Sequence, residues 1–282
     1  MKNFSLSRRQ MLGGSAALGL STLVAPTIAP AVSGSQKQVP GIQLYTVRES
    51  MASDVPGTLQ AIAGIGYKEV EFAGYGDHPP QQVRGLLDDL GLQSPSSHVL
   101  ANAIRDEPLP LIEAATVIGN DYLTIAWLNP DDRQSLDDYK RWAEVFNRAG
   151  EVCRENGIRV AFHNHDFEFL PIDGQRPFDI LLSETDPALV DFEVDMYWVR
   201  KAGHDVLNVL NSAPGRFTMA HIKDMDEQGN FAEVGTGVID FGSILGNEAA
   251  SGLRHLFVEH DQPSDPFKSA AISYLAMVSL LE

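Results

Sequence analysis

The densest run of chemically reactive side chains in this 282-residue chain lies between residues 163 and 168. His163, His165, Asp166 and Glu168 place two imidazoles and two carboxylates there, directly after the apolar stretch Val160 to Phe162. Imidazole and carboxylate groups together are common ligands of Mn, Fe, Co and Zn. The pattern therefore indicates a metal-binding segment, with a hydrogen-bonded polar turn as the alternative.

Three further reactive side chains each follow a short apolar run directly. They are Asp195, His221 and Glu259, with Trp198 just beyond the first and Lys223 just beyond the second. Any one of them could cap a helix or form a salt bridge. Three consecutive apolar runs that end in Asp, His and Glu instead favour one shared site.

Weaker candidates stand at the ends of three earlier apolar runs. They are Gln43, Glu71 and His98. We expect these side chains to form the opposite wall of the same pocket and to contact a substrate. Taken singly, each is equally well explained as a hydrogen-bonded surface or supporting group.

The elements that must position these residues alternate regularly from Pro40 onward. Short strand-like apolar runs are separated by longer segments of helical spacing, the pattern of a parallel sheet with crossover helices. Strands are expected at Gly41 to Thr46, Tyr67 to Phe72, Gln93 to Ser97, Tyr122 to Ala126, Arg159 to His163, Leu189 to Val194, Phe217 to His221 and His255 to Glu259. Helices are expected at Pro56 to Gly64, Pro79 to Gly91, Pro108 to Ile118, Ser135 to Asn156, Pro177 to Ser183, Asp205 to Ser212, Phe241 to Gly246 and Pro266 to Leu281.

This alternation predicts an α/β fold, a single (β/α)8 TIM barrel over residues 40–282. An open doubly wound sheet is the alternative, but the glycine-rich phosphate turn that should follow its first strand is missing from Tyr45 to Glu49. In a (β/α)8 barrel, catalytic groups project from the C-terminal ends of the strands. The reactive residues stand at these ends, so they should meet at one mouth of the barrel.

The charge balance argues against one class of partner. Lys and Arg number 21 against 38 Asp and Glu, which gives a formal net charge of −17. Such a surface repels phosphate backbones, so no nucleic-acid partner is expected. The single cysteine, Cys153, excludes an intrachain disulfide, and we expect it to be a packed thiol near a helix end.

The N-terminal segment differs from the rest of the chain. Ser7 to Leu12 contains Arg8-Arg9 and precedes an apolar, small-residue stretch that ends near a candidate cleavage site at Ala29 to Ala31. The segment resembles a twin-arginine signal and predicts a signal peptide (1–31), a linker (32–39) and a periplasmic or otherwise exported protein. Pro26 interrupts the stretch, so no stable membrane insertion is expected after cleavage. An uncleaved anchor is the alternative.

Together, the motifs resemble the sugar phosphate isomerase/epimerase family of the xylose isomerase-like barrels. The resemblance covers essentially the whole mature chain and implies a small-molecule sugar substrate. It is carried by Gly41 to Arg48, His163 to Phe169, Asp195 to Trp198, Ala202-Gly203, His221 to Asp224, Glu233 to Phe241 and Val258-Glu259.

The resemblance implies one divalent metal held by Glu, Asp, His and Glu at the ends of strands five to eight. The last three ligands carry over to Asp195, His221 and Glu259. Many relatives have a glutamate at the first position, where this chain has His163. We assign Glu168 as the fourth ligand, with His163 or His165 as its replacement. Mn is the expected metal, with Mg, Co or Zn as alternatives.

The mechanism that the resemblance implies is proton abstraction beside a substrate carbonyl, through an enediolate that the metal stabilises. The expected catalytic residues are Glu168, Glu259 and His163. The substrate would be contacted by His165, Lys223, Trp198, Glu71, His98 and Gln43.

Three functions follow as expectations from this resemblance and the export signal. The first is a metal-dependent isomerase or epimerase of a keto-sugar or sugar derivative. The second is an exported 3-keto-glycoside lyase or hydrolase, because phosphorylated sugars are scarce outside the cytoplasm and no clear arginine cluster could hold a phosphate. The third is a non-catalytic periplasmic sugar-binding protein. A similarity to apurinic endonucleases is set aside, because those are richer in histidine ligands and act on DNA.

Overall fold

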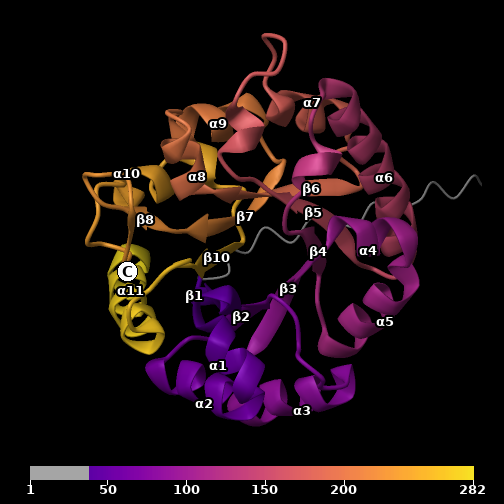
Figure 1. Ribbon diagram of the computed structural model, residues 1–282. Coiled ribbons are helices and arrows are strands. Elements are labelled where there is room, and N and C mark those ends of the chain that lie inside the picture. Colours follow the sequence, from indigo (N-terminus) through magenta and orange to yellow (C-terminus); the bar gives the residue numbers. More distant parts are fainter. Residues whose placement is uncertain (1–37) are drawn as a thin grey trace, which may run out of the picture. The chain divides into compact units, whose positions relative to one another are not determined.

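The computed structural model describes residues 38–282, so the signal peptide and almost all of the linker lie outside the described residues. Eight parallel strands close into a barrel in the order β1-β10-β7-β6-β5-β4-β3-β2 (Figure 1). They are β1 (Pro40–Gln43), β2 (Glu69–Phe72), β3 (Gln93–Val99), β4 (Tyr122–Ile125), β5 (Arg159–His163), β6 (Val190–Asp195), β7 (Phe217–Ile222) and β10 (His255–Val258). The prediction of a single (β/α)8 barrel is confirmed.

Helices surround the barrel and join its strands (Figure 1). They are α1 (Arg48–Ser53), α2 (Val55–Ile65), α3 (Pro80–Leu90), α4 (Ala101–Asp106), α5 (Pro108–Ile118), α6 (Leu136–Glu155), α7 (Pro177–Glu184), α8 (Met196–Lys201), α9 (Val206–Ser212), α10 (Phe241–Leu245) and α11 (Pro266–Leu281). The longest of them, α6, begins with a capping box in which Ser135 and Asp138 satisfy each other's backbone N–H groups. Gly66 and Gly157 each adopt a positive φ just before the next strand begins, as their places in the sequence predict.

Several short elements are absent from the sequence-based expectation. They are α1, α4 and α8, four 3-10 turns, and the antiparallel pair β8 (Asp224–Met225) and β9 (Phe231–Ala232). Such elements are too short for a hydrophobic period to be read, and local caps determine them instead. In α8, for example, the Asp195 side chain accepts from the Trp198 N–H at 2.9 Å and caps the helix.

The barrel contains a small apolar cluster on the N-terminal side of the polar strand ends. Tyr122, Ala161, Met219 and Phe257 form an apolar cluster inside the barrel. A separate, larger apolar core includes buried residues of both the strands and the surrounding helices. Among the described residues, no helix is both long and apolar enough to cross a membrane.

Candidate metal centre

Strand register brings four ligand-type side chains together at the mouth of the barrel. Asp195, at the end of β6, is the direct neighbour of His221 on β7. His163 ends β5, and Glu259 directly follows β10. Ligand atoms of these four residues all lie within 4.8 Å of one another, and all four residues are buried. We call this set the strand-end group.

Both histidines of the strand-end group are oriented by a second hydrogen bond. His163 donates from Nδ1 to the Ala126 carbonyl at 3.1 Å, which leaves Nε2 directed at Asp195 Oδ2, 3.3 Å away. His221 contacts Glu71 Oε2 through Nε2 at 2.8 Å, which leaves Nδ1 beside Glu259 Oε2 at 2.9 Å. Histidines that bind metals are held in this way, with one ring nitrogen fixed by a partner and the other free to coordinate.

Two buried atoms of the group have no partner in hydrogen-bond geometry. They are His221 Nδ1 and Glu259 Oε2, although the two approach each other closely and Lys223 Nζ is paired electrostatically with the same carboxylate oxygen. Leaving buried polar atoms unsatisfied is costly, so such pairs call for an explanation. A divalent cation would satisfy both atoms. Two imidazole nitrogens and two carboxylates form a donor set that suits Mn, Fe, Co or Zn better than Mg or Ca.

Lys223 provides the positive charge that balances the carboxylates. Its Nζ lies 3.0 Å from Asp195 Oδ2, 2.7 Å from Glu259 Oε2 and 2.9 Å from Asp261 Oδ1. Burial alone would raise the pKa of Asp195, but Lys223 and His163 hold that pKa well below its ordinary value. Burial would likewise lower the pKa of Lys223, but Asp195 and Glu259 raise it well above its ordinary value. The lysine is therefore a fixed buried cation.

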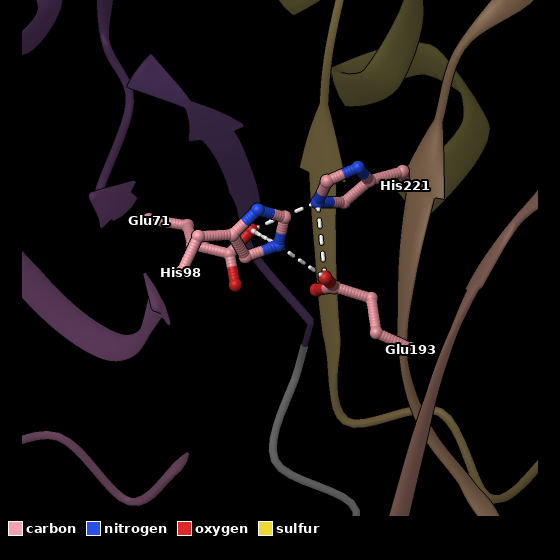
Figure 2. A group of neighbouring side chains, drawn as sticks. All are labelled: Glu71, His98, Glu193 and His221. Atoms are coloured by element: carbon pink, nitrogen blue, oxygen red, sulfur yellow. Dashed lines mark hydrogen bonds and ion pairs between the residues drawn. The ribbon is translucent and has the colours of Figure 1, made fainter. Parts of the chain in front are cut away.

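Directly behind His221 lies a second set, Glu71, His98 and Glu193, which we call the support group. Figure 2 shows both imidazoles directed at the two carboxylates. His98 Nε2 lies 2.8 Å from Glu193 Oε2, and His221 Nε2 lies 3.2 Å from the same oxygen. Burial would lower the pKa of His221, but Glu193 and Glu259 outweigh it and raise that pKa well above its ordinary value. The support group thus fixes the ring of His221.

The support group together with His221 also has the residue types of a metal site, since its ligand atoms lie equally close together. Its atoms, however, are largely engaged by the protein itself. Glu71 Oε2 accepts from Gln43 Nε2 at 2.7 Å as well as contacting His221, and Glu71 Oε1 accepts from Ser96. We therefore assign these residues to orienting His221 rather than to a second ion.

A cavity of about 720 Å³ opens onto the strand-end group. It is lined by five of the residues that the sequence singled out: His98, His163, His165, Lys223 and Glu259. Its volume lies within the range of clefts that bind small molecules.

Three predicted substrate contacts lie elsewhere. Gln43 and Glu71 are fully buried and do not line the cavity, and Gln43 donates a hydrogen bond to Glu71. Trp198 is absent from the cavity lining and packs against His165, with ring centroids 5.4 Å apart.

Glu168 is not part of the strand-end group, contrary to the expectation for the fourth ligand. Its Oε2 accepts the backbone N–H of His165 at 2.8 Å, so the carboxyl closes the turn after β5. His163, the replacement that the sequence offered, stands in its place because it occupies the last position of the strand itself. Glu168 therefore positions His165 and does not face the strand-end group.

The sequence of the chain also matches one protein family. The profile of the xylose isomerase-like TIM barrel family matches residues 59–271, which is most of the chain. The chain belongs to this family.

Three individual proteins that are similar to this chain share at most 27% of its residues over the matched regions. An inosose dehydratase from Lacticaseibacillus casei is 27% identical over 157 residues, which is 49% of this chain and 51% of that protein. The chain thus spans about half the length of the curated relative it matches. A sugar phosphate isomerase/epimerase from Parabacteroides distasonis superposes with a TM-score of 0.75 at 24% identity, over 92% of this chain and all of that one. The IOLI protein, solved with a bound zinc atom, has a TM-score of 0.68 at 15% identity, over 86% and 98% of the two chains. At these identities, the two solved structures establish the fold alone.

One segment that carried the xylose isomerase-like resemblance has a clear structural role. The loop from Glu233 to Phe241 is tied down by the buried Asp224, whose carboxylate accepts the backbone N–H groups of Gly235, Gly237 and Ile239. A Cβ at position 237 would clash with the Asp224 carboxylate, and Gly235 has a φ of +83°. The glycines are thus needed for the loop to close over the carboxylate.

Sequence reasoning missed several residues of the site. Glu193 could have been found from strand alternation, because positions 191, 193 and 195 lie on one face of β6 and Asp195 faces the barrel mouth. Asp261 and Trp127 line the cavity from the loops, where no period exists to reveal them. Burial and Glu259 raise the pKa of Asp261 to about 6, and Lys223 opposes that rise.

The position of Glu168 predicts an unusual pH dependence of stability. Burial raises the pKa of its carboxyl from the ordinary 4.5 to about 8. The folded chain therefore holds this proton more tightly than the unfolded chain, and the free energy of unfolding should fall as pH rises from about 4.5 to about 8. Glu168→Gln cannot ionise, so the variant should be more stable than wild type by roughly 2 kcal/mol or more at about pH 9. At about pH 5 the two should be similar.

Urea unfolding of both proteins at the two pH values measures this difference. Glu227→Gln is the matched control, because Glu227 is exposed and its loss should change stability little at either pH. A gap between Glu168→Gln and wild type that does not change with pH would contradict the buried, protonated carboxyl.

Proposed function

We propose that this chain is a metal-dependent enzyme that moves a proton at the carbon beside the carbonyl of a keto-sugar or sugar derivative, as an isomerase or epimerase. The observation that carries the proposal is the strand-end group. Four ligand-type side chains from four neighbouring strands converge at the C-terminal mouth of a barrel of this family, and two of their atoms have no partner in hydrogen-bond geometry. The sugar phosphate isomerase/epimerase name of a structural neighbour supports the same reaction class.

In this proposal His163, Asp195, His221 and Glu259 hold the ion. Bound there, a divalent cation would polarise a substrate carbonyl and acidify the neighbouring C–H bond. Glu259 and His165 would transfer the proton, because both line the cavity. Burial keeps the pKa of His165 well below its ordinary value, so its ring is neutral at pH 7 and can accept a proton, and its Nδ1 has no partner.

The charges of the cavity favour an unphosphorylated substrate. Among the described residues that line it, Lys223 is the only lysine or arginine. That lysine is already surrounded by three carboxylates. A phosphate dianion would need further cations or bidentate arginines, which this lining does not provide. Export by the twin-arginine route, which stays a prediction, agrees with such a substrate.

Solvent exchange tests the proposed reaction. The protein would be incubated with a panel of ketopentoses and ketohexoses in D2O with added Mn2+, and the sugars analysed by NMR and mass spectrometry. We expect one deuterium to enter at the carbon beside the carbonyl of at least one sugar, and Glu259→Gln to abolish this exchange. Metal-loaded protein that exchanges no proton with any member of the panel would count against proton transfer and in favour of a sugar-binding protein.

A second reaction of the same site is elimination from a 3-keto-glycoside. The inosose dehydratase similarity favours it, because dehydration is an elimination. Loss of the C2 proton and of the aglycone from C1 would give an alkene conjugated with the C3 carbonyl and a free alcohol. Release of p-nitrophenol from 3-keto p-nitrophenyl glucoside would show cleavage of the glycosidic bond, which an isomerase would leave intact, and an alkene conjugated with the C3 carbonyl in the sugar product would identify elimination.

The support group leads to a prediction about metal affinity. Glu193 contacts His98 and His221 but is not among the proposed ligands. Glu193→Gln removes the charge that holds the His221 ring, and the affinity for Mn2+ or Zn2+ should fall about 10- to 100-fold, as is typical for partners behind a ligand. Isothermal titration would measure the change. Glu184→Gln, at an exposed helix end, is the control, and an unchanged affinity in Glu193→Gln would contradict the supporting role.

A further inference from the structure

The cavity at the strand-end group continues into a part that the proposed chemistry does not use. Its polar wall carries the residues described above, while much of the remaining lining is apolar. The apolar part is formed by the end of β3, by α4 and α5, and by β4. Its side chains are Val99, Leu100, Ala103, Leu111, Ala114 and Leu123, which we call the apolar lobe.

Large apolar side chains gather at the rim of the same cavity. Of the seven large hydrophobic residues that are exposed among the described residues, three line this cavity. They are Tyr45, Leu100 and Trp127, with exposed fractions of 43%, 62% and 37%. Scattered exposed apolar residues need no explanation, but a cluster around one cavity marks a binding surface. Aromatic rims of this kind provide contact area for an apolar or ring-shaped group.

The size of the cavity fits a ligand larger than one sugar ring. A volume of about 720 Å³ lies in the upper part of the range for clefts that bury drug-sized ligands. A single hexose is smaller than such a ligand and is polar around its whole edge. A hexose that reached the strand-end group would therefore leave the apolar lobe without a partner.

We propose that the natural substrate is a sugar derivative that carries an apolar, ring-sized substituent, with the sugar at the strand-end group and the substituent in the apolar lobe. This inference rests on the proposed function for the placement of the sugar. Because one cavity extends across both parts, we assign both of its ends to a single small molecule. A free hexose or a sugar phosphate would not use the lobe.

Binding of matched glycosides tests the proposal. The affinities of phenyl β-D-glucopyranoside and methyl β-D-glucopyranoside would be measured by isothermal titration, with the Mn2+-loaded full chain and with the EDTA-treated chain. We expect the phenyl glycoside to bind about 10- to 100-fold more tightly, the gain that burial of one aromatic ring provides. Equal affinities, or no measurable binding of the phenyl glycoside, would overturn the proposal.

Three variants test whether the apolar lobe causes the preference for the phenyl glycoside. Ala103→Phe places a ring in the lobe and should remove the phenyl advantage while leaving the methyl glycoside unaffected. Trp127→Ala shortens an exposed rim residue without disturbing the core and should reduce the advantage. Leu109→Phe is the matched control, since Leu109 is 59% exposed on α5 and does not line the cavity. A phenyl advantage that survives both Ala103→Phe and Trp127→Ala would place the ring elsewhere and overturn the proposal.

The same titrations separate this proposal from the proposed function. If the protein binds Mn2+ but does not prefer the phenyl glycoside, the metal centre is supported and the apolar lobe is excluded as a substrate site. If the protein prefers the phenyl glycoside but binds no divalent ion, the apolar lobe is supported as a binding site and the metal-dependent reaction is excluded.

Discussion

His221→Ala should reduce the affinity for a divalent ion by at least about 100-fold and abolish proton exchange. Partners behind a metal ligand contribute up to about that much, and removal of the ligand should cost no less. His221 also stands between the strand-end group and the support group, with contacts to Glu71, Glu193 and Glu259. Isothermal titration with Mn2+ and Zn2+ measures the loss.

Two further variants make the His221 result interpretable. Asp195→Asn keeps the shape of a proposed ligand and removes only its charge, so it should also lose the ion in a chain that remains folded. His78→Ala changes a histidine in the loop after β2, outside both groups, and should bind metal like wild type. Metal affinity that is unchanged in both His221→Ala and Asp195→Asn would exclude the strand-end group as the ion site.

Lys223→Met should lower the free energy of unfolding of the metal-free protein by about 3 to 5 kcal/mol. The Lys223 ammonium is almost completely buried and lies within 3.0 Å of Asp195, Glu259 and Asp261. Removing one partner of such a cluster leaves the buried carboxylates with less compensating charge, and this is where the cost arises. A bound divalent ion would supply the missing charge, so added Zn2+ should restore much of the lost stability.

Urea unfolding of the variant with and without Zn2+ measures both effects. Lys68→Met is the control, because Lys68 is exposed and its replacement should cost less than about 0.5 kcal/mol. If Lys223→Met were as stable as wild type without metal, the lysine would not be the counter-ion of these carboxylates. If Zn2+ stabilised the variant no more than wild type, the ion would bind elsewhere.

The fold was predictable because each strand carries its own signal. Apolar runs preceded by glycine or proline marked all eight strands. The first strand was predicted too long: it ends at Gln43 instead of Thr46, because the Gln43 side chain caps a 3-10 turn over Leu44–Val47. Asp195, His221 and Glu259 were predictable for a related reason: each stands at or next to the C-terminal end of its strand, and parallel strands of a barrel end at the same mouth. Position along the strand was enough to bring these three together.

At the fifth strand, sequence spacing alone did not identify the ligand. Its last residue and the turn beyond it offered His163, His165 and Glu168, and sequence spacing could not determine which side chain points into the barrel. A hydrogen bond from the His165 backbone to Glu168 turns that carboxyl away. The apolar lobe was equally hidden, because residues from β3, β4, α4 and α5 meet only after the chain has folded.

The location of a bound ion tests the proposed metal centre most directly. A crystal of the full chain, grown with Zn2+ or Mn2+ and measured at the absorption edge of the metal, would locate it by anomalous scattering. We predict one strong peak about 2.0 to 2.2 Å from His163 Nε2, from His221 Nδ1 and from carboxylate oxygens of Asp195 and Glu259. A peak beside Glu168, a peak among Glu71, His98 and Glu193, or the absence of any peak would contradict the assignment of the strand-end group as the metal centre.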